Sequence, residues 1–65
     1  MKNKFSYTIQ TVSHEYRVAL SGSLLSFYED DKLSRVQDVD ANCFDRQNLY
    51  ELCERIATNK NGKLI

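Results

Sequence analysis

One histidine and two cysteines are the side chains best suited to chemistry in this chain of 65 residues. A base beside a thiol activates it as a nucleophile, so catalysis would require His14 to meet Cys43 or Cys53. The polar break at Ser13-His14 predicts a hairpin tip, whereas Cys53 falls on the apolar face of a predicted helix. We therefore expect no catalytic residues and a protein that is not an enzyme. His14 is interpreted as an exposed turn residue, and the cysteines as reduced structural thiols, because one pair makes no convincing disulfide framework.

Metal binding and cofactor binding have no supporting pattern either. The histidine and the cysteines form neither a Cys-x-x-Cys nor a His-x-x-x-His pair, which zinc sites commonly use. Four oxygen-bearing residues alternate in the manner of a calcium loop: Asp38, Asp40, Asn42 and Asp45. An EF-hand counted from Asp38 would need glycine at its sixth position and glutamate at its twelfth, but these are Cys43 and Leu49. We expect no metal and no cofactor.

Exposed acidic and apolar residues are the remaining candidates for a functional surface. Residues 29–45 contain six acidic residues and two basic ones, a local charge of −4. If Leu25 and Phe27 point into the core, their neighbours on the strand point outward, and tyrosine is enriched at interface hot spots. The predicted partner-contacting residues are Leu24, Tyr28, Asp30, Asp31, Asp38, Asp40 and Tyr50.

These residues predict a small non-enzymatic protein-interaction module, such as a regulator or inhibitor of another protein. It would act through its acidic segment or through the outer face of its sheet. The expected partner is another protein, and self-association as a homodimer is the alternative. Small proteins of this kind are often encoded by phages or mobile elements, which is a general expectation and not a property of particular residues.

Nucleic-acid binding is the alternative function. It would use basic residues scattered near the two termini: Lys2, Lys4, Arg17, Lys60 and Lys63. The formal net charge of zero argues against it, because nucleic-acid binders usually carry a basic excess. Polar residues interrupt the start of the chain, so no signal peptide is predicted, and no run approaches the about 18 apolar residues of a membrane span. We therefore expect a cytoplasmic protein without membrane contact.

A helix predicted over Phe44–Ala57 is the element around which the rest must be arranged. Its apolar residues recur at i, i+3, i+4 and i+7 and so share one face: Leu49, Leu52, Cys53 and Ile56. Asp45 is the predicted N-cap, and the capping box is expected to be incomplete because Asn48 stands where Glu or Gln is usual. A helix of this length is marginal alone in water, so it needs a surface to pack on.

Alternating apolar residues predict the sheet that supplies this surface. Lys4–Val12 and Glu15–Leu20 are predicted strands of an antiparallel hairpin. Leu24–Glu29 has two interpretations, a third strand, which we favour, and a short helix capped by Ser23. Leu33–Val39 is predicted as a fourth strand at the edge, with a bulge, because its apolar residues are spaced by three. The charges on this strand are of the kind that protect an edge from pairing with other chains.

The predicted fold class is α+β, an antiparallel β-meander of three or four strands with one C-terminal α-helix packed on one face. Residues 1–65 are predicted to form a single small domain, in which about residues 59–65 are a polar tail that frays. The predicted inner face of the sheet, toward the helix, consists of Phe5, Tyr7, Ile9, Tyr16, Val18, Leu20, Leu25 and Phe27.

Overall fold

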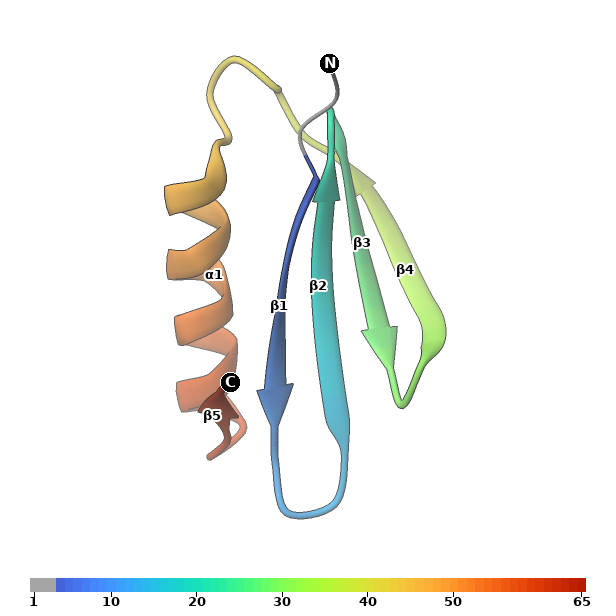
Figure 1. Cartoon of the computed structure of the whole chain (residues 1–65), viewed down its shortest axis with the longest axis vertical. Coiled ribbons are helices and arrows are strands. Elements are labelled where there is room, and N and C mark those ends of the chain that lie inside the picture. Colours follow the sequence, from blue (N-terminus) through green and yellow to red (C-terminus); the bar gives the residue numbers. More distant parts are fainter. Residues whose placement is uncertain (1–3) are drawn as a thin grey trace.

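Five antiparallel strands and one helix make up the part of the chain that the computed structural model describes, residues 4–65. The elements are β1 (Lys4–Gln10), β2 (Glu15–Ser21), β3 (Leu24–Glu29), β4 (Lys32–Asp38), α1 (Arg46–Asn59) and β5 (Lys63–Leu64). The sheet order is β4-β3-β2-β1-β5, and α1 lies on the β1 side of the four long strands (Figure 1). This arrangement confirms the predicted α+β class, with a meander and a single C-terminal helix.

The alternation of apolar and polar residues places one face of β1, β2 and β3 toward the core. Tyr7 pairs with Val18, and Val18 pairs in turn with Phe27, so apolar side chains form rows across three strands. The residues between them point to the opposite face, called the outer face below. Residues 24–29, for which a helix was the alternative, form a strand because the register with β2 brings Leu25 to only 2% exposure.

A bulge explains the three-residue spacing of apolar residues in β4. Phe27 pairs with Arg35, but the next residue, Tyr28, pairs with Leu33, so one residue of β4 is left without a partner. The extra residue shifts the alternation of the strand. Leu33 and Val36 therefore both lie on the outer face, as the partners of outer-face residues of β3. The predicted edge strand and its bulge are confirmed.

The core lies between the inner face of the sheet and the apolar stripe of α1. Its fully buried members come from both layers: Ile9, Val18, Leu20, Leu25, Leu49, Cys53 and Ala57. Leu52 and Ile56 flank this cluster and are half-buried against it, so the whole predicted stripe faces the sheet. Every residue predicted for the inner face belongs to this core or packs on it.

The start of α1 is capped more completely than the sequence pattern predicts. The Asp45 side chain accepts a hydrogen bond from the Asn48 backbone N–H at 3.0 Å, as expected for the N-cap. The Asn48 side chain accepts a bond from the Asp45 N–H in return, also at 3.0 Å. The expectation of an incomplete capping box was therefore wrong, because the amide oxygen of Asn48 takes the role usual for Glu or Gln.

The end of the chain is ordered, which corrects the expectation of a tail that frays from about residue 59. Asn61 has a positive φ of 56°, and the Gly62 N–H donates to the Ala57 carbonyl at 2.8 Å, which is a Schellman ending of the helix. The chain then reverses, and Leu64 pairs with Ile9 as part of β5. The short segment escaped prediction because two residues carry no periodicity.

The single helix covers only part of the sheet. It packs against β1, β2 and β5, and the β3–β4 hairpin lies at the far side of the sheet from it (Figure 1). All seven residues of β4 are exposed. Within residues 4–65, no helix combines the length and the apolarity that crossing a membrane requires.

Gly62→Ala tests the turn that docks β5. A Cβ atom at Gly62 would lie 2.8 Å from the Gln10 carbonyl oxygen and 2.9 Å from the Thr11 Cγ2 atom, so the turn would have to move. We expect the free energy of unfolding, measured by urea denaturation, to fall by about 1–3 kcal/mol, the usual cost of overpacking. Gly22→Ala is the spatial control, because nothing lies within 4 Å of its Cβ position and only its positive φ of 62° should cost stability. Unchanged stability of Gly62→Ala would show that β5 does not depend on this close approach.

Candidate functional site

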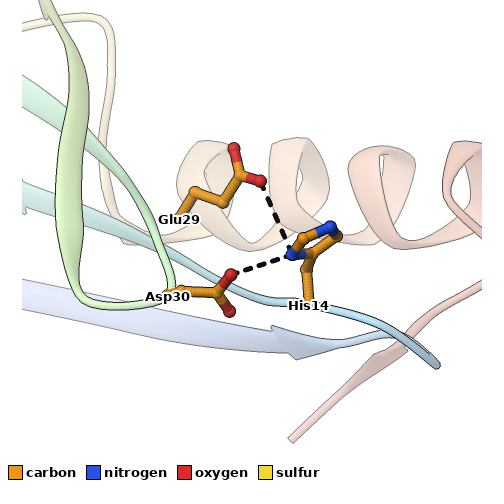
Figure 2. Close-up of side chains that lie close together, drawn as sticks. All are labelled: His14, Glu29 and Asp30. Atoms are coloured by element: carbon orange, nitrogen blue, oxygen red, sulfur yellow. Dashed lines mark hydrogen bonds and ion pairs between the residues drawn. The ribbon is translucent and has the colours of Figure 1, made fainter.

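A histidine and two carboxylates come together where two hairpins meet. His14 precedes β2, and Glu29 and Asp30 lie at the end of β3 and in the turn that follows. The His14 Nδ1 atom is 2.8 Å from Asp30 Oδ2 and 3.6 Å from Glu29 Oε2. Figure 2 shows both carboxylates directed at this nitrogen. The three residues are called the His14 cluster below.

Backbone geometry holds Asp30 in place for this contact. Asp30 and Asp31 both have positive φ angles, 52° and 70°, as a two-residue hairpin turn of the primed type requires. Aspartate tolerates this region better than most residues. The second oxygen of Asp30, Oδ1, accepts the Glu15 backbone N–H at 2.9 Å, so the carboxylate connects the turn to β2 as well as to the imidazole.

The electrostatics of the His14 cluster favour an ion pair. The hydrogen bond to Asp30 raises the pKa of His14, against a smaller lowering by desolvation. The hydrogen bonds from the Glu15 N–H and from His14 lower the pKa of Asp30. Both side chains are largely exposed, 43% for His14 and 52% for Asp30, so the pair is screened by solvent and acts as a weak connection between the hairpins.

The geometry of the His14 cluster suits the coordination of a metal ion rather than the activation of a nucleophile by a base. One nitrogen and two carboxylate oxygens lie within 4.8 Å of one another, a spacing compatible with a metal ion. A proton on His14 Nδ1 accounts for the same contacts without an ion. The cluster escaped prediction because its members are far apart in the sequence and meet only through the register of the two hairpins.

Neither cysteine meets His14. Cys43 is exposed, and its thiol donates to the Asp40 carboxylate at 3.5 Å. Cys53 is fully buried beneath α1, and burial raises the pKa of its thiol to about 11. A thiol that stays protonated at neutral pH is a poor nucleophile, so the geometry supports the interpretation of Cys53 as a core residue. Both cysteines are free, as expected.

The acidic candidates do not form one surface. Asp30 and Asp31 lie in the turn before β4, whereas Asp38 and Asp40 lie at and beyond its other end, about 20 Å away for a seven-residue strand. Asp31 contacts Arg17 at 3.4 Å. Asp40 accepts the backbone N–H two residues later at 3.0 Å and so shapes its own turn.

Tyr50 also lies apart from the other candidates. It is on α1, where its ring packs edge-on against Tyr7 with centroids 5.4 Å apart. The Glu54 carboxylate beside it raises the pKa of Tyr50. Tyr50 therefore belongs to the margin of the core at the β1 side, on the other layer from the outer face of the sheet.

The apolar candidates Leu24 and Tyr28 do form part of a contiguous surface. Leu33 lies opposite Tyr28, and Val36 lies opposite Ser26, between the two candidates on the same face. The exposed fractions are 45% for Leu24, 57% for Leu33 and 48% for Val36. These four apolar residues of β3 and β4 are called the outer patch below. Leu33 and Val36 escaped prediction as site residues because only the observed register shows that the bulge puts them on this face.

On the inner face, the same hairpin borders a groove. It has a volume of about 380 Å³ and lies between β3–β4 and the last turns of α1, with lining residues that include Phe27, Arg35, Ile56 and Lys60. The Arg35 guanidinium lies 4.4 Å from the centroid of the Phe27 ring and covers it. Both faces of the β3–β4 hairpin are therefore open to solvent, and aliphatic exposure is concentrated on the outer one.

The basic candidates for nucleic-acid binding are divided between faces. Arg17 lies on the outer face and stacks on Tyr28 at 4.4 Å, whereas Lys60 lies at the end of α1, 4.6 Å from the Tyr16 ring. Lys4 and Lys63 are exposed at the start of β1 and in β5. Lys2 lies outside the described residues. The basic candidates that the structure does describe form no continuous basic stripe along which a phosphate backbone could run.

Comparison with known proteins adds no family to these observations. The chain matches no protein-family model, no curated protein and no solved structure.

The ion pair in the His14 cluster predicts a pH-dependent stability. Because the pKa of His14 is raised on folding, its contribution is fully present below its ordinary value of 6.5 and is lost as the pH rises through the folded value. Because the pKa of Asp30 is lowered, its contribution is present above its ordinary value of 3.8 and is lost as the pH falls. We therefore expect the pair to stabilise the fold most between these two values, as measured by urea denaturation against pH.

Asp30→Asn provides the matched control for this prediction. The amide oxygen can still accept the Glu15 N–H, so the turn is kept while the charge facing His14 is removed. In an NMR titration of the imidazole, the pKa of His14 should return toward its ordinary value in this variant. An equally raised pKa in Asp30→Asn would contradict the assignment of Asp30 as its cause.

Proposed function

We propose that this chain is a small non-enzymatic protein-interaction module that binds another protein through the outer face and free edge of the β3–β4 hairpin. The observation that carries the proposal is the outer patch, where exposed aliphatic side chains gather on the part of the sheet that α1 does not cover. Apolar surface that is contiguous and rimmed by charge is typical of sites that bind proteins.

The backbone of β4 adds a second means of binding. β4 pairs with β3 on one side only among the described strands, so its other edge carries unpaired N–H and C=O groups. A segment of another protein can add to such an edge as a further strand, with main-chain hydrogen bonds for affinity and side-chain contacts for specificity. The outer patch lies beside this edge and would supply the apolar contacts.

We favour the outer patch over the acidic segment as the surface that binds the partner. Asp30 and Asp40 already accept hydrogen bonds that shape their turns, so their carboxylates are occupied within the chain. Asp38 lies at the end of β4 and could add a charged contact at the rim. We retain the expectation that such binding regulates or inhibits the partner.

A comparison of two lysine variants tests the proposal. Val36→Lys places a charge in the middle of the outer patch, and Thr58→Lys places the same charge on an exposed position of α1, in the other layer of the fold. We expect a protein captured by the wild-type chain to bind Val36→Lys at least about tenfold more weakly, since a hot-spot loss exceeds about 1.4 kcal/mol. Thr58→Lys should bind it like the wild type, as measured by calorimetry with the purified partner.

The acidic alternative is tested with the variants that leave the turns intact. Asp31→Asn removes a charge with a residue that also tolerates the positive φ of this position, and Asp38→Lys reverses a charge. Both keep the hydrogen bonds made by Asp30 and Asp40. Binding that is lost in these two variants and kept in Val36→Lys would replace the outer patch by the acidic residues as the binding surface.

A further inference from the structure

We propose that a second copy of this chain occupies the free edge of β4, with the two β4 strands antiparallel about a two-fold axis at Val36. This inference rests on the proposed function, because it names the partner of the same hairpin. It follows from the phase of the hydrogen bonds in β4, from the placement of its charges and from the position of the outer patch.

The hydrogen bonds between β3 and β4 determine which residues of β4 can pair outward. The Val39 N–H donates to the Ser23 carbonyl at 2.8 Å, directly outside the opposed residues Leu24 and Asp38. A bond at that position marks Leu24 and Asp38 as a non-hydrogen-bonded pair, and such pairs alternate along an antiparallel ladder. The N–H and C=O groups of Val36, two residues earlier, therefore point away from β3 toward the free edge.

The two-fold axis at Val36 uses these groups without conflict. Val36 of each copy would exchange both backbone bonds with Val36 of the other, as a hydrogen-bonded pair of an antiparallel ladder. On the inner face, Arg35 of each copy would lie opposite Gln37 of the other, a charge opposite a neutral amide. The antiparallel direction also brings the end with Lys32 toward the end with Asp38, so opposite charges approach at both ends of the ladder.

Other registers are disfavoured by the same charges. An axis at Arg35 would place two guanidinium groups directly opposite each other, and like charges in that position destabilise a sheet. Charged residues on an edge strand usually protect it from pairing. In β4 the arginine opposes an axis at Arg35, and an axis at Gln37 would place the apolar Val36 opposite the charged Asp38. The bulge at Ser34 ends the regular part of the strand, so the paired stretch is short and the dimer is expected to be weak.

Pairing at this edge would join the two outer patches. Val36 of each copy would lie beside Val36 of the other, and Leu24 of each copy lies diagonally from Val36, next to its β3 partner Ser26 on the same face. The result is one apolar strip on the outer face of a continuous sheet of both copies. The formal net charge of zero adds no long-range repulsion between the copies.

Val36→Pro tests the pairing, because proline removes the one N–H that the proposed dimer uses twice. Proline is tolerated on an edge strand where its nitrogen faces away from the sheet, and circular dichroism would verify that the fold is kept. Val36→Thr is the matched control, since it retains both the N–H and the β-branched shape. By sedimentation equilibrium up to millimolar concentration, we expect wild type and Val36→Thr to dimerise and Val36→Pro to need at least about tenfold higher concentration. A wild-type chain that stays monomeric, or a folded Val36→Pro variant that dimerises like wild type, would overturn the proposal.

Cysteine cross-linking tests the register without relying on proline. In a chain carrying Cys43→Ser, the variants Arg35→Cys, Val36→Cys and Gln37→Cys would be oxidised separately. Opposed residues of a hydrogen-bonded pair have Cα atoms about 5.5 Å apart, within the range of a disulfide. We expect Val36→Cys to form covalent dimer fastest, and faster cross-linking at either neighbouring position would refute the proposed register.

These measurements separate the dimer from the proposed function. A monomeric chain whose captured partner still depends on Val36 would refute the dimer alone. A dimer in the expected register, combined with partner binding that Val36→Lys leaves unchanged, would refute the outer patch as the binding surface for another protein.

Discussion

An α-helix with its side chains is about 10 Å across, whereas neighbouring strands of a sheet lie about 4.8 Å apart. One helix can therefore shield two or three strands, and residues 4–65 form five strands and one helix. The helix α1 lies on β5, β1 and β2, where Leu49, Cys53 and Ala57 complete the core. The β3–β4 hairpin extends beyond this cover, and it contributes the buried Leu25 to the core and the partly buried Phe27 to its margin. The groove on the inner face of the β3–β4 hairpin follows from this difference in width, whereas the outer face lies on the side of the sheet opposite α1.

Cationic side chains shield the aromatic rings that the helix leaves uncovered. Arg35 lies over Phe27 on the inner face, and Arg17 lies over Tyr28 on the outer face, each at 4.4 Å from the ring centroid. In such contacts the guanidinium group itself covers one face of the ring and is attracted to it. Only an aromatic ring attracts a cation in this way. An aliphatic side chain such as Val36 therefore cannot be shielded by a cation–π contact. The aliphatic members of the outer patch, Leu24, Leu33 and Val36, therefore stay exposed beside the shielded ring of Tyr28.

The sequence predicted the elements whose periodicity is long enough to be unambiguous. The stripe of α1, the alternation in β1 to β3 and even the bulge of β4 follow from local spacing, because burial of one face repeats along each element. Contacts between elements were not predictable in the same way. His14 and Asp30 meet through the combined register of two hairpins, and Val36 joins Leu24 only once the pairing of β3 with β4 is known. β5 is held by the close approach that Gly62 permits, which no pattern of hydrophobic residues records.

The pairing of β1 with β5 has a consequence for the order in which the chain can fold. Ile9 and Leu64 are neighbours in the sheet, although nearly the whole chain separates them in sequence. The hairpins of the meander are local and can close early, since short loops cost little entropy. The meander can therefore form before α1 and β5 pack on it. Until α1 does so, the apolar rows of β1 and β2 face water, and exposed apolar surface of this kind makes a partly folded chain prone to aggregate.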